Sequence, residues 1–265
     1  MRTLMKSVAT VAFVALLAAP LRAELKYTMK MDAHKSATPA PAADPMMAML
    51  SNTIVSTMVP EGGVEITCTL GDKGSRIEYN KAYSGVPAGG VTLVRPDGSL
   101  IVMDPATKTY WKLAKPDMTG LPPGMTPIVK TTKTGQMATI AGLRSERITI
   151  DINIPLPVPA GAQLPPGLPT SLSVGGEVWI TPQYKNYTKT ASLMGAMAAL
   201  GLDKVMSEGL MTRSILRGGI LGDQEVESVI TKVGEQTVPA TTFDVPADFK
   251  EVPPPGGGGF GGSRE

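Results

Sequence analysis

The chain is built from short segments in which apolar and polar residues alternate, and this pattern limits the folds available to it. The clearest segment is Arg147–Ile154, in which every second residue is an isoleucine and each residue between is polar. Successive side chains of a strand point to opposite faces, so these isoleucines share one face. The pattern predicts an antiparallel sheet with one buried side and one solvated side.

Similar segments recur along the chain and are separated by turn-forming residues. Residues 71–74, 95–98 and 104–107 contain Gly, Asp or Pro in arrangements that favour tight turns. The turns join neighbouring segments closely enough to predict an antiparallel meander. We predict strands at 25–31, 64–70, 75–79, 91–94, 100–103, 108–113, 137–141, 147–154, 173–181, 213–216 and 224–233.

Few segments favour helix. Residues 184–206 form the one strong candidate, because Leu193, Met194, Met197 and Leu200 recur at helical spacing. Residues 46–58 fit a short helix or a connecting segment equally well. Pro155–Pro169 contains six prolines, which excludes a central strand or a helix interior and predicts a surface insert.

The two ends of the chain have compositions of their own. Arg2 and Lys6 precede an apolar run from Val8 to Ala19, which is typical of a secretory signal peptide cut after the small residue Ala23. The run is shorter than the roughly 20 residues that a membrane-spanning helix needs. We therefore expect a leader at 1–23, one domain at 24–252, a disordered Pro/Gly-rich tail at 253–265, and a periplasmic or secreted location.

Removing the leader changes the charge balance. Lys+Arg falls from 25 to 22 against 23 Asp+Glu, so the formal net charge goes from +2 to −1. A nucleic-acid partner therefore gains no support from charge. Cys68 is the single cysteine and His34 the single histidine, which excludes an intrachain disulfide and zinc sites built from several Cys or His ligands. Cys68 lies in an alternating strand, as a buried apolar residue would.

No catalytic motif stands out. Glu225 and Glu227 fall on one face of a predicted strand, and we interpret them as part of a solvated face rather than as a catalytic carboxylate pair. Methionines are abundant near the start of the chain, and thioethers suit Cu(I). A Cu(I) site using Met29, Met31, His34, Met46, Met47 and Met49 is therefore an alternative hypothesis, set against methionine as an adaptable packing residue.

Three segments together resemble a family of exported bacterial proteins, the DUF4412 group, with a LolA-like lipoprotein-carrier fold. They are residues 101–111 (IVMDPATKTYW), 176–182 (GEVWITP) and 242–252 (TFDVPADFKEV). The resemblance spans roughly Leu25 to Val252. It implies a mainly β (α+β) fold, in which a curved antiparallel sheet, or half-barrel, is covered by a few helices and encloses an apolar interior. In related carriers that interior holds acyl chains.

The sequence thus predicts a non-catalytic periplasmic protein, with no cofactor, that binds a lipid, an acyl chain or an envelope protein. A structural protein with a closed core is the remaining alternative. We expect a cavity, if one forms, to be lined by residues of the helix and of two strands. The predicted lining residues are Trp179, Leu193, Met194, Met197 and Leu200, with Tyr110 and Trp111 near the rim.

Overall fold

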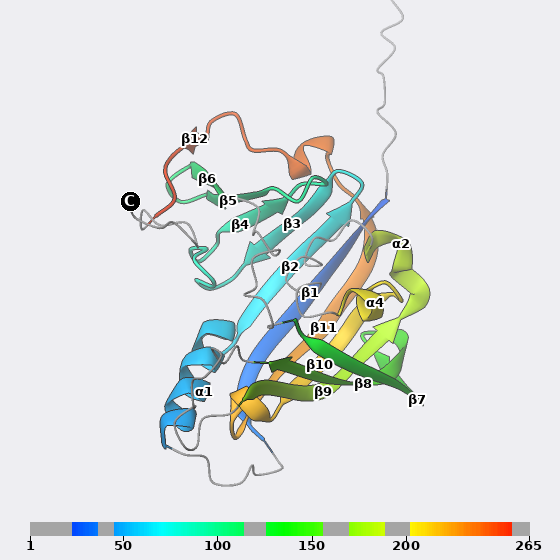
Figure 1. Ribbon diagram of the computed structural model, residues 1–265. Helices are drawn as coiled ribbons and strands as arrows, with labels where there is room; N and C mark the ends of the chain where they lie inside the picture. Colours follow the sequence, from blue (N-terminus) through cyan, green and yellow to red (C-terminus); the bar gives the residue numbers. More distant parts are fainter. Residues whose placement is uncertain (1–22, 37–44, 114–125, 156–169, 189–201, 256–265) are drawn as a thin grey trace, which may run out of the picture.

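The computed structural model describes residues 23–36, 45–113, 126–155, 170–188 and 202–255. Within these ranges, twelve strands form one sheet in the order β12-β6-β5-β4-β3-β2-β1-β11-β10-β9-β8-β7 (Figure 1). The strands are β1 (Ala23–Lys35), β2 (Val64–Gly71), β3 (Gly74–Tyr79), β4 (Val91–Val94), β5 (Leu100–Asp104), β6 (Thr109–Leu113), β7 (Ile128–Ile140), β8 (Leu143–Pro155), β9 (Ser171–Thr181), β10 (Leu210–Arg217), β11 (Gln224–Thr237) and β12 (Lys250–Glu251).

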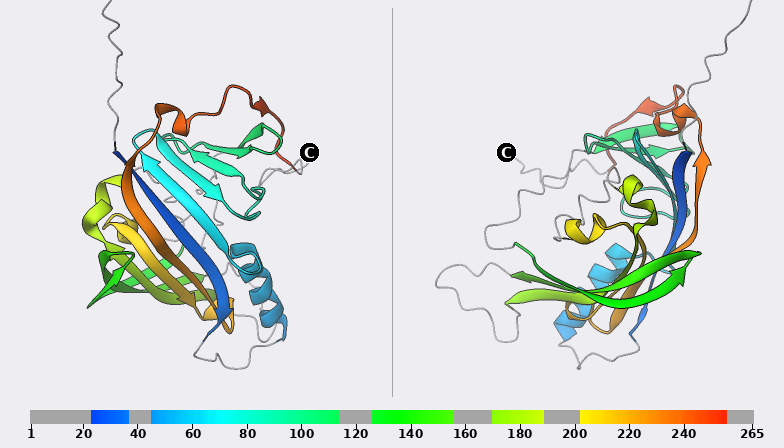
Figure 2. Two further views of the ribbon diagram at one scale, coloured as in Figure 1. Left: turned by 180° about the vertical axis from the view of Figure 1, so that it is seen from behind. Right: turned by 90° about the vertical axis from the view of Figure 1, so that its right-hand side faces the viewer.

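All neighbouring strands pair antiparallel except β12, which runs parallel to β6. The sheet is curved and does not close on itself, and short helices lie within its concavity (Figure 2). The α-helices are α1 (Pro45–Met58), α2 (Lys185–Thr188) and α4 (Asp203–Met206), and the 3-10 turns are η2 (Pro182–Tyr184), η3 (Gly219–Leu221) and η4 (Ala240–Phe243). The fold is therefore mainly β, as the sequence predicts.

The concave side of the sheet, called here the inner face, carries most of the apolar core. Its centre is formed by β1 and β2, where Tyr27 pairs with Cys68 and Met29 pairs with Ile66. On β8 and β9 the inner face presents the isoleucines predicted to share a face, together with Val178 and Ile180, and α4 packs against them. Alternation thus determines which side of each strand is buried.

The opposite, outer face is covered at β4 and β5 by the segment 239–252, called here the C-terminal strap. Val245 and Phe249 of the strap pack on a cluster formed by Val91, Leu93, Ile101 and Met103. The main-chain carbonyl oxygens of Ala240 and Thr242 accept from Lys73 at 3.2 Å and from Arg76 at 3.5 Å. This cover explains why all four residues of β4 are buried, although a strand with one solvated face would alternate.

Most of the predicted strands are confirmed, with changes at their ends. The first strand extends to Lys35, so His34 belongs to a strand and pairs with Glu225. The strand predicted at 137–141 is the second half of the longer β7. Residues 46–58, which the sequence leaves undecided, fall within helix α1. The helix predicted at 184–206 is described only at its two ends. The first end consists of Tyr184 of η2 and helix α2, and the second is helix α4. Residues 189–201 lie outside the described residues.

Candidate functional site

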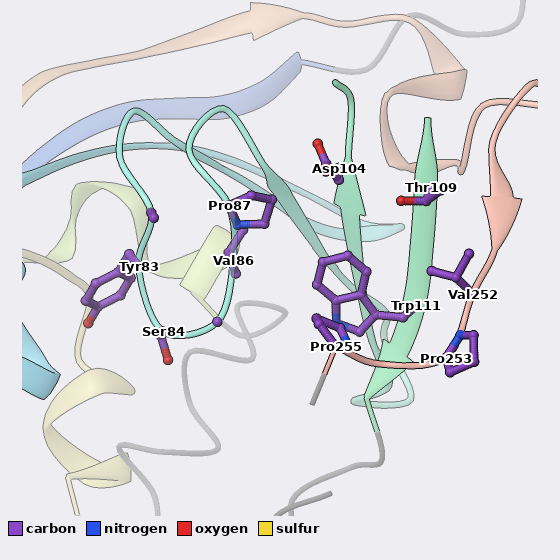
Figure 3. Close-up of a pocket in the computed structure, with 12 residues that line it drawn as sticks. Tyr83, Ser84, Val86, Pro87, Asp104, Thr109, Trp111, Val252, Pro253 and Pro255 are labelled. Carbon is purple, nitrogen blue, oxygen red and sulfur yellow. The ribbon is translucent and has the colours of Figure 1, made fainter. Parts of the chain in front are cut away.

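The candidate site is a pocket of about 640 Å³ between β5, β6, the turn after β3 and the end of the C-terminal strap (Figure 3). Apolar residues dominate its lining. The lining residues are Ala82, Tyr83, Ser84, Gly85, Val86, Pro87, Asp104, Thr109, Trp111, Val252, Pro253 and Pro255. A pocket of this size is within the range that holds a small apolar molecule.

The sheet register places Trp111 in this pocket. Trp111 lies opposite Val102 in the β5–β6 ladder, and Val102 lies opposite Thr92 in the β4–β5 ladder. The same row continues through the register to Cys68, so Trp111 is on the inner face. Its side chain is only 6% exposed and forms a cluster with Val86 and Val102. The indole is therefore held by packing and forms the buried base of the pocket, called here its floor.

A tight turn supplies the second wall. Tyr83 and Val86 exchange two main-chain hydrogen bonds of 2.9 Å across Ser84 and Gly85. Both central residues have positive φ, 50° for Ser84 and 80° for Gly85, as a two-residue turn of type I′ requires. Val86 and Pro87 lie on the side of the turn that faces Trp111, whereas the ring of Tyr83 points to the other side (Figure 3).

Tyr83 is held in place by aromatic and sulfur contacts. Its ring stacks on that of Tyr79, with centroids 5.9 Å apart, and its hydroxyl donates to the Sδ of Met31 at 4.0 Å. Burial raises the pKa of the Tyr83 hydroxyl, which therefore stays neutral at physiological pH. The wall is apolar and carries no charge of its own.

The end of the C-terminal strap and the prolines that follow it supply the third wall. The main-chain N–H of Lys250 donates to the carbonyl of Lys108, and that of Val252 donates to Tyr110, both at 2.9 Å. These bonds bring Val252, Pro253 and Pro255 beside Trp111 (Figure 3). Prolines have no N–H to pair, so this wall exposes apolar rings without leaving unpaired donors.

One carboxylate stands among these apolar groups. Asp104 accepts hydrogen bonds from the main-chain N–H of Ala106 at 3.0 Å and from the hydroxyl of Thr107 at 2.9 Å. The Thr107 hydroxyl also lies 2.7 Å from that of Thr109. These bonds orient the Asp104 carboxylate while leaving it further lone pairs for an external donor.

The structure separates the residues that the sequence places in one cavity. Trp111 lines the pocket, whereas Tyr110 is on the outer face of β6, where its hydroxyl donates to Glu251 at 2.9 Å. Trp179 is half-buried and pairs with Arg147 and Arg213, on the face of β9 opposite Val178. Leu193, Met194, Met197 and Leu200 lie outside the described residues.

Glu225 and Glu227, interpreted from the sequence as part of a solvated face, belong to a network of charges on the outer face. Glu227 accepts from Arg213 at 2.7 Å, while Glu225 lies 3.7 Å from both Arg217 and His34. Glu225 is only 7% exposed, so the prediction of a solvated face is wrong for this residue. Glu225 also accepts a hydrogen bond from the Ser36 hydroxyl at 2.6 Å, and these contacts assign it a structural role.

Of the methionines proposed for Cu(I), those whose side chains are described do not gather around the histidine. Met29 and Met31 point to the inner face and pack in the core, while His34 is on the outer face. Met49 on α1 is 73% exposed. The side chains of Met46 and Met47 lie outside the described residues. Among the His, Cys, Asp and Glu side chains that are described, no three come close enough together to hold a metal ion.

Cys68 is fully buried between Tyr27 and Ile77. Burial raises the pKa of its thiol to about 11, and burial likewise raises the pKa of Tyr27 well above its usual value. A thiol that stays protonated at neutral pH is a poor nucleophile. The prediction that Cys68 is a buried apolar residue is confirmed.

Sequence reasoning identifies Trp111 but not its partners. Val86, Pro87 and Val252 approach Trp111 from two segments that flank β6 in space and are far from it in the chain. The one local signal is the pair Ser84-Gly85, which is typical of a two-residue turn. No part of the described chain forms a helix that is both long and apolar enough to span a bilayer.

Comparisons with known proteins find similarity among solved structures. No family model matches the sequence, and no curated protein matches it. Among solved structures, a LolA superfamily protein from Nitrosomonas europaea is similar over 84% of this chain and 90% of that chain, with 8% sequence identity and a TM-score of 0.29.

Proposed function

We propose that this protein is a non-catalytic binding protein that holds an apolar ligand, a lipid or an acyl chain, in the pocket beside Trp111. The supporting observation is the pocket itself, in which a buried indole meets the apolar groups of Val86, Pro87 and Val252. Such a site gains about 0.8 kcal/mol per buried CH₂ before the cost of ordering the ligand is subtracted.

The proposal includes a location outside the cytoplasm. The basic and apolar pattern of residues 1–23 supports an exported protein. Native mass spectrometry of the protein recovered from the periplasm is the first test. We expect masses of bound lipid or acyl chains. A bare mass would favour a protein with a closed core, and an added copper mass would favour the methionine site.

The two tryptophans provide a matched test of the pocket. We expect Trp111→Ala to weaken binding of the neutral fluorophore phenylnaphthylamine at least tenfold, because it removes the floor of the pocket. Trp179→Ala removes an equally large side chain from the outer face of β9 and should leave binding unchanged. Equal effects of the two substitutions would contradict the assignment.

A second variant avoids the core. Pro253 lines the pocket but is exposed, so Pro253→Glu places a charge in the apolar wall without disturbing buried packing. We expect it to fold like the wild type and to bind the fluorophore more weakly. Wild-type affinity in both Trp111→Ala and Pro253→Glu would show that the ligand binds elsewhere.

A further inference from the structure

Asp104 is the one charged side chain among the twelve residues that line the pocket. It lies opposite Thr109 in the antiparallel β5–β6 ladder. The pair formed by Val102 and Trp111 is two residues away along the same ladder. Asp104 and Trp111 therefore share the inner face as diagonal neighbours, a separation that a bound molecule spans easily. The close-up shows Asp104 and Thr109 beyond one end of the indole (Figure 3).

Nearby cations do not neutralise this carboxylate. Lys108 lies 2.9 Å from Asp248 of the strap. Lys81 donates to the main-chain carbonyl oxygens of Glu61 and Gly62, at 3.3 and 2.8 Å. Within the described part of the chain, Asp104 forms no ion pair, and it accepts hydrogen bonds from the neutral donors Ala106 and Thr107. Among these residues, the pocket thus presents one negative charge without a cationic partner.

The groups beside Asp104 also favour a cation. Trp111 lines the pocket as a diagonal neighbour of Asp104, and the face of an indole ring attracts ammonium groups. A carboxylate beside an aromatic ring and an apolar wall complements a molecule with an alkyl body and a positive head. The same carboxylate repels an anionic head such as that of a fatty acid.

We infer that the ligand of this pocket is a cationic amphiphile, with its alkyl chain against Trp111 and Val252 and its ammonium group beside Asp104. The inference rests on the proposed function, since it assigns the charge of the ligand bound at the same site. It selects among ligands by charge, and it assigns Asp104 as the residue that sets this preference.

Three probes with the same alkyl chain and different heads test the inference. Decyltrimethylammonium, decanol and decanoate are titrated below their micelle concentrations at low salt, with binding followed by calorimetry. We expect the cation to bind about fivefold more tightly than decanol, which is typical of a half-exposed ion pair, and decanoate to bind most weakly. The advantage of the cation should shrink in high salt.

Two isosteric variants locate the effect. Asp104→Asn keeps an oxygen that accepts from the main-chain N–H of Ala106, places an amide NH2 that can donate to the Thr107 hydroxyl, and removes the charge, so the affinity for the cation should fall to that for decanol. Asp151→Asn removes an exposed carboxylate from the outer face of β8 and should leave all three affinities unchanged. Both variants should retain wild-type binding of decanol.

The outcomes distinguish this inference from the proposed function. Binding of decanol and decanoate as tight as that of the cation would overturn the charge preference alone. A preference for the cation that persists in Asp104→Asn would overturn the role of Asp104. Failure of all three probes to bind the wild type would overturn both the inference and the proposed function.

Discussion

The hydroxyl of Tyr110 donates a hydrogen bond to the carboxylate of Glu251 across 2.9 Å, and the ammonium of Lys112 lies 2.9 Å from the same carboxylate. Tyr110 and Lys112 point to the outer face of β6, while Trp111 between them points to the pocket. One strand thus anchors the C-terminal strap with one face and forms the pocket floor with the other. The pocket and the strap are mechanically linked through these three residues.

Acid should release the strap. Lys112 and Tyr110 lower the pKa of Glu251, and Lys108 lowers the pKa of Asp248. A carboxyl whose folded-state pKa is lowered contributes stability above its unfolded pKa and loses it as the pH falls through the folded value. We expect the strap to stay docked above pH 4.5, the ordinary pKa of a glutamate, and to loosen below pH 3.8, that of an aspartate.

The emission of Trp111 reports this release, because Val252 of the strap packs in the same cluster as the indole. The measurement uses a Trp179→Phe background, so that Trp111 is the only emitting tryptophan. A variant carrying Asp248→Asn and Glu251→Gln should lose the acid transition. An identical transition in that variant would assign it to other groups.

Two neighbouring glycines of β9 should respond very differently to alanine. A Cβ on Gly176 would overlap the carbonyl of Ile215 on the adjacent strand, whereas one on Gly175 would lie 3.8 Å from the nearest carbonyl oxygen, an ordinary contact. We expect Gly176→Ala to lower the free energy of unfolding by about 3 kcal/mol, since the strands must separate. Gly175→Ala should change it by less than about 1 kcal/mol. Urea titration followed by circular dichroism measures both, and equal losses would contradict the close approach at Gly176.

Alkaline pH should destabilise the core around Cys68. Its thiol has a pKa of about 11 in the folded protein, against 9.0 for the free side chain. Its contribution to stability is therefore complete below pH 9 and is lost as the pH rises toward 11, by roughly 2 to 3 kcal/mol in total. Urea titrations at pH 8 and pH 10.5 measure the difference, with the upper value chosen to lie between the two pKa values. Alkylation by iodoacetamide at pH 8 should require unfolding, and rapid labelling of the native protein would contradict burial.

The strap should contribute to stability through its apolar contacts. Phe249 packs half-buried on the outer face of β4 and β5, so Phe249→Ala should lower the free energy of unfolding by about 2 kcal/mol. Asp248→Ala changes the neighbouring residue, whose ion pair with Lys108 is exposed, and should have a clearly smaller effect at neutral pH. Equal losses from the two variants would show that the strap is held by charge.

The strands of this fold are predictable where one face is buried, because burial imposes alternation on a local stretch of sequence. In Arg147–Ile154 this holds, and the isoleucines share the inner face. The first half of β7, from Ile128 to Gly135, carries no such pattern, since most of β7 is exposed at the edge of the sheet. Nothing in the physical environment of that segment requires an apolar residue at every second position.

Alternation along β9 places Trp179 on the outer face, away from the pocket residues with which the sequence prediction groups it. Val178 and Ile180 face the core, so Trp179 between them must face outward, beside Arg147. The alternation in residues 173–181 contains this information, but the expectation that a large aromatic residue lines a cavity overrides it. The contact of Trp111 with Val86 and Val252 has no local signal at all, since register and the path of the strap create it.

The pairing of β1 with β11 determines how late this protein can complete its sheet. Glu24 lies opposite Gln236 in the finished ladder, so the centre of the sheet joins residues separated by more than two hundred positions. Chains dominated by such distant contacts fold slowly, because a long loop must close before the contacts form. Until β11 is available, the meander from β2 to β6 and the strands from β7 to β10 have no shared neighbour to hold them together. We therefore expect the sheet to acquire most of its stability only once β11 has paired with β1.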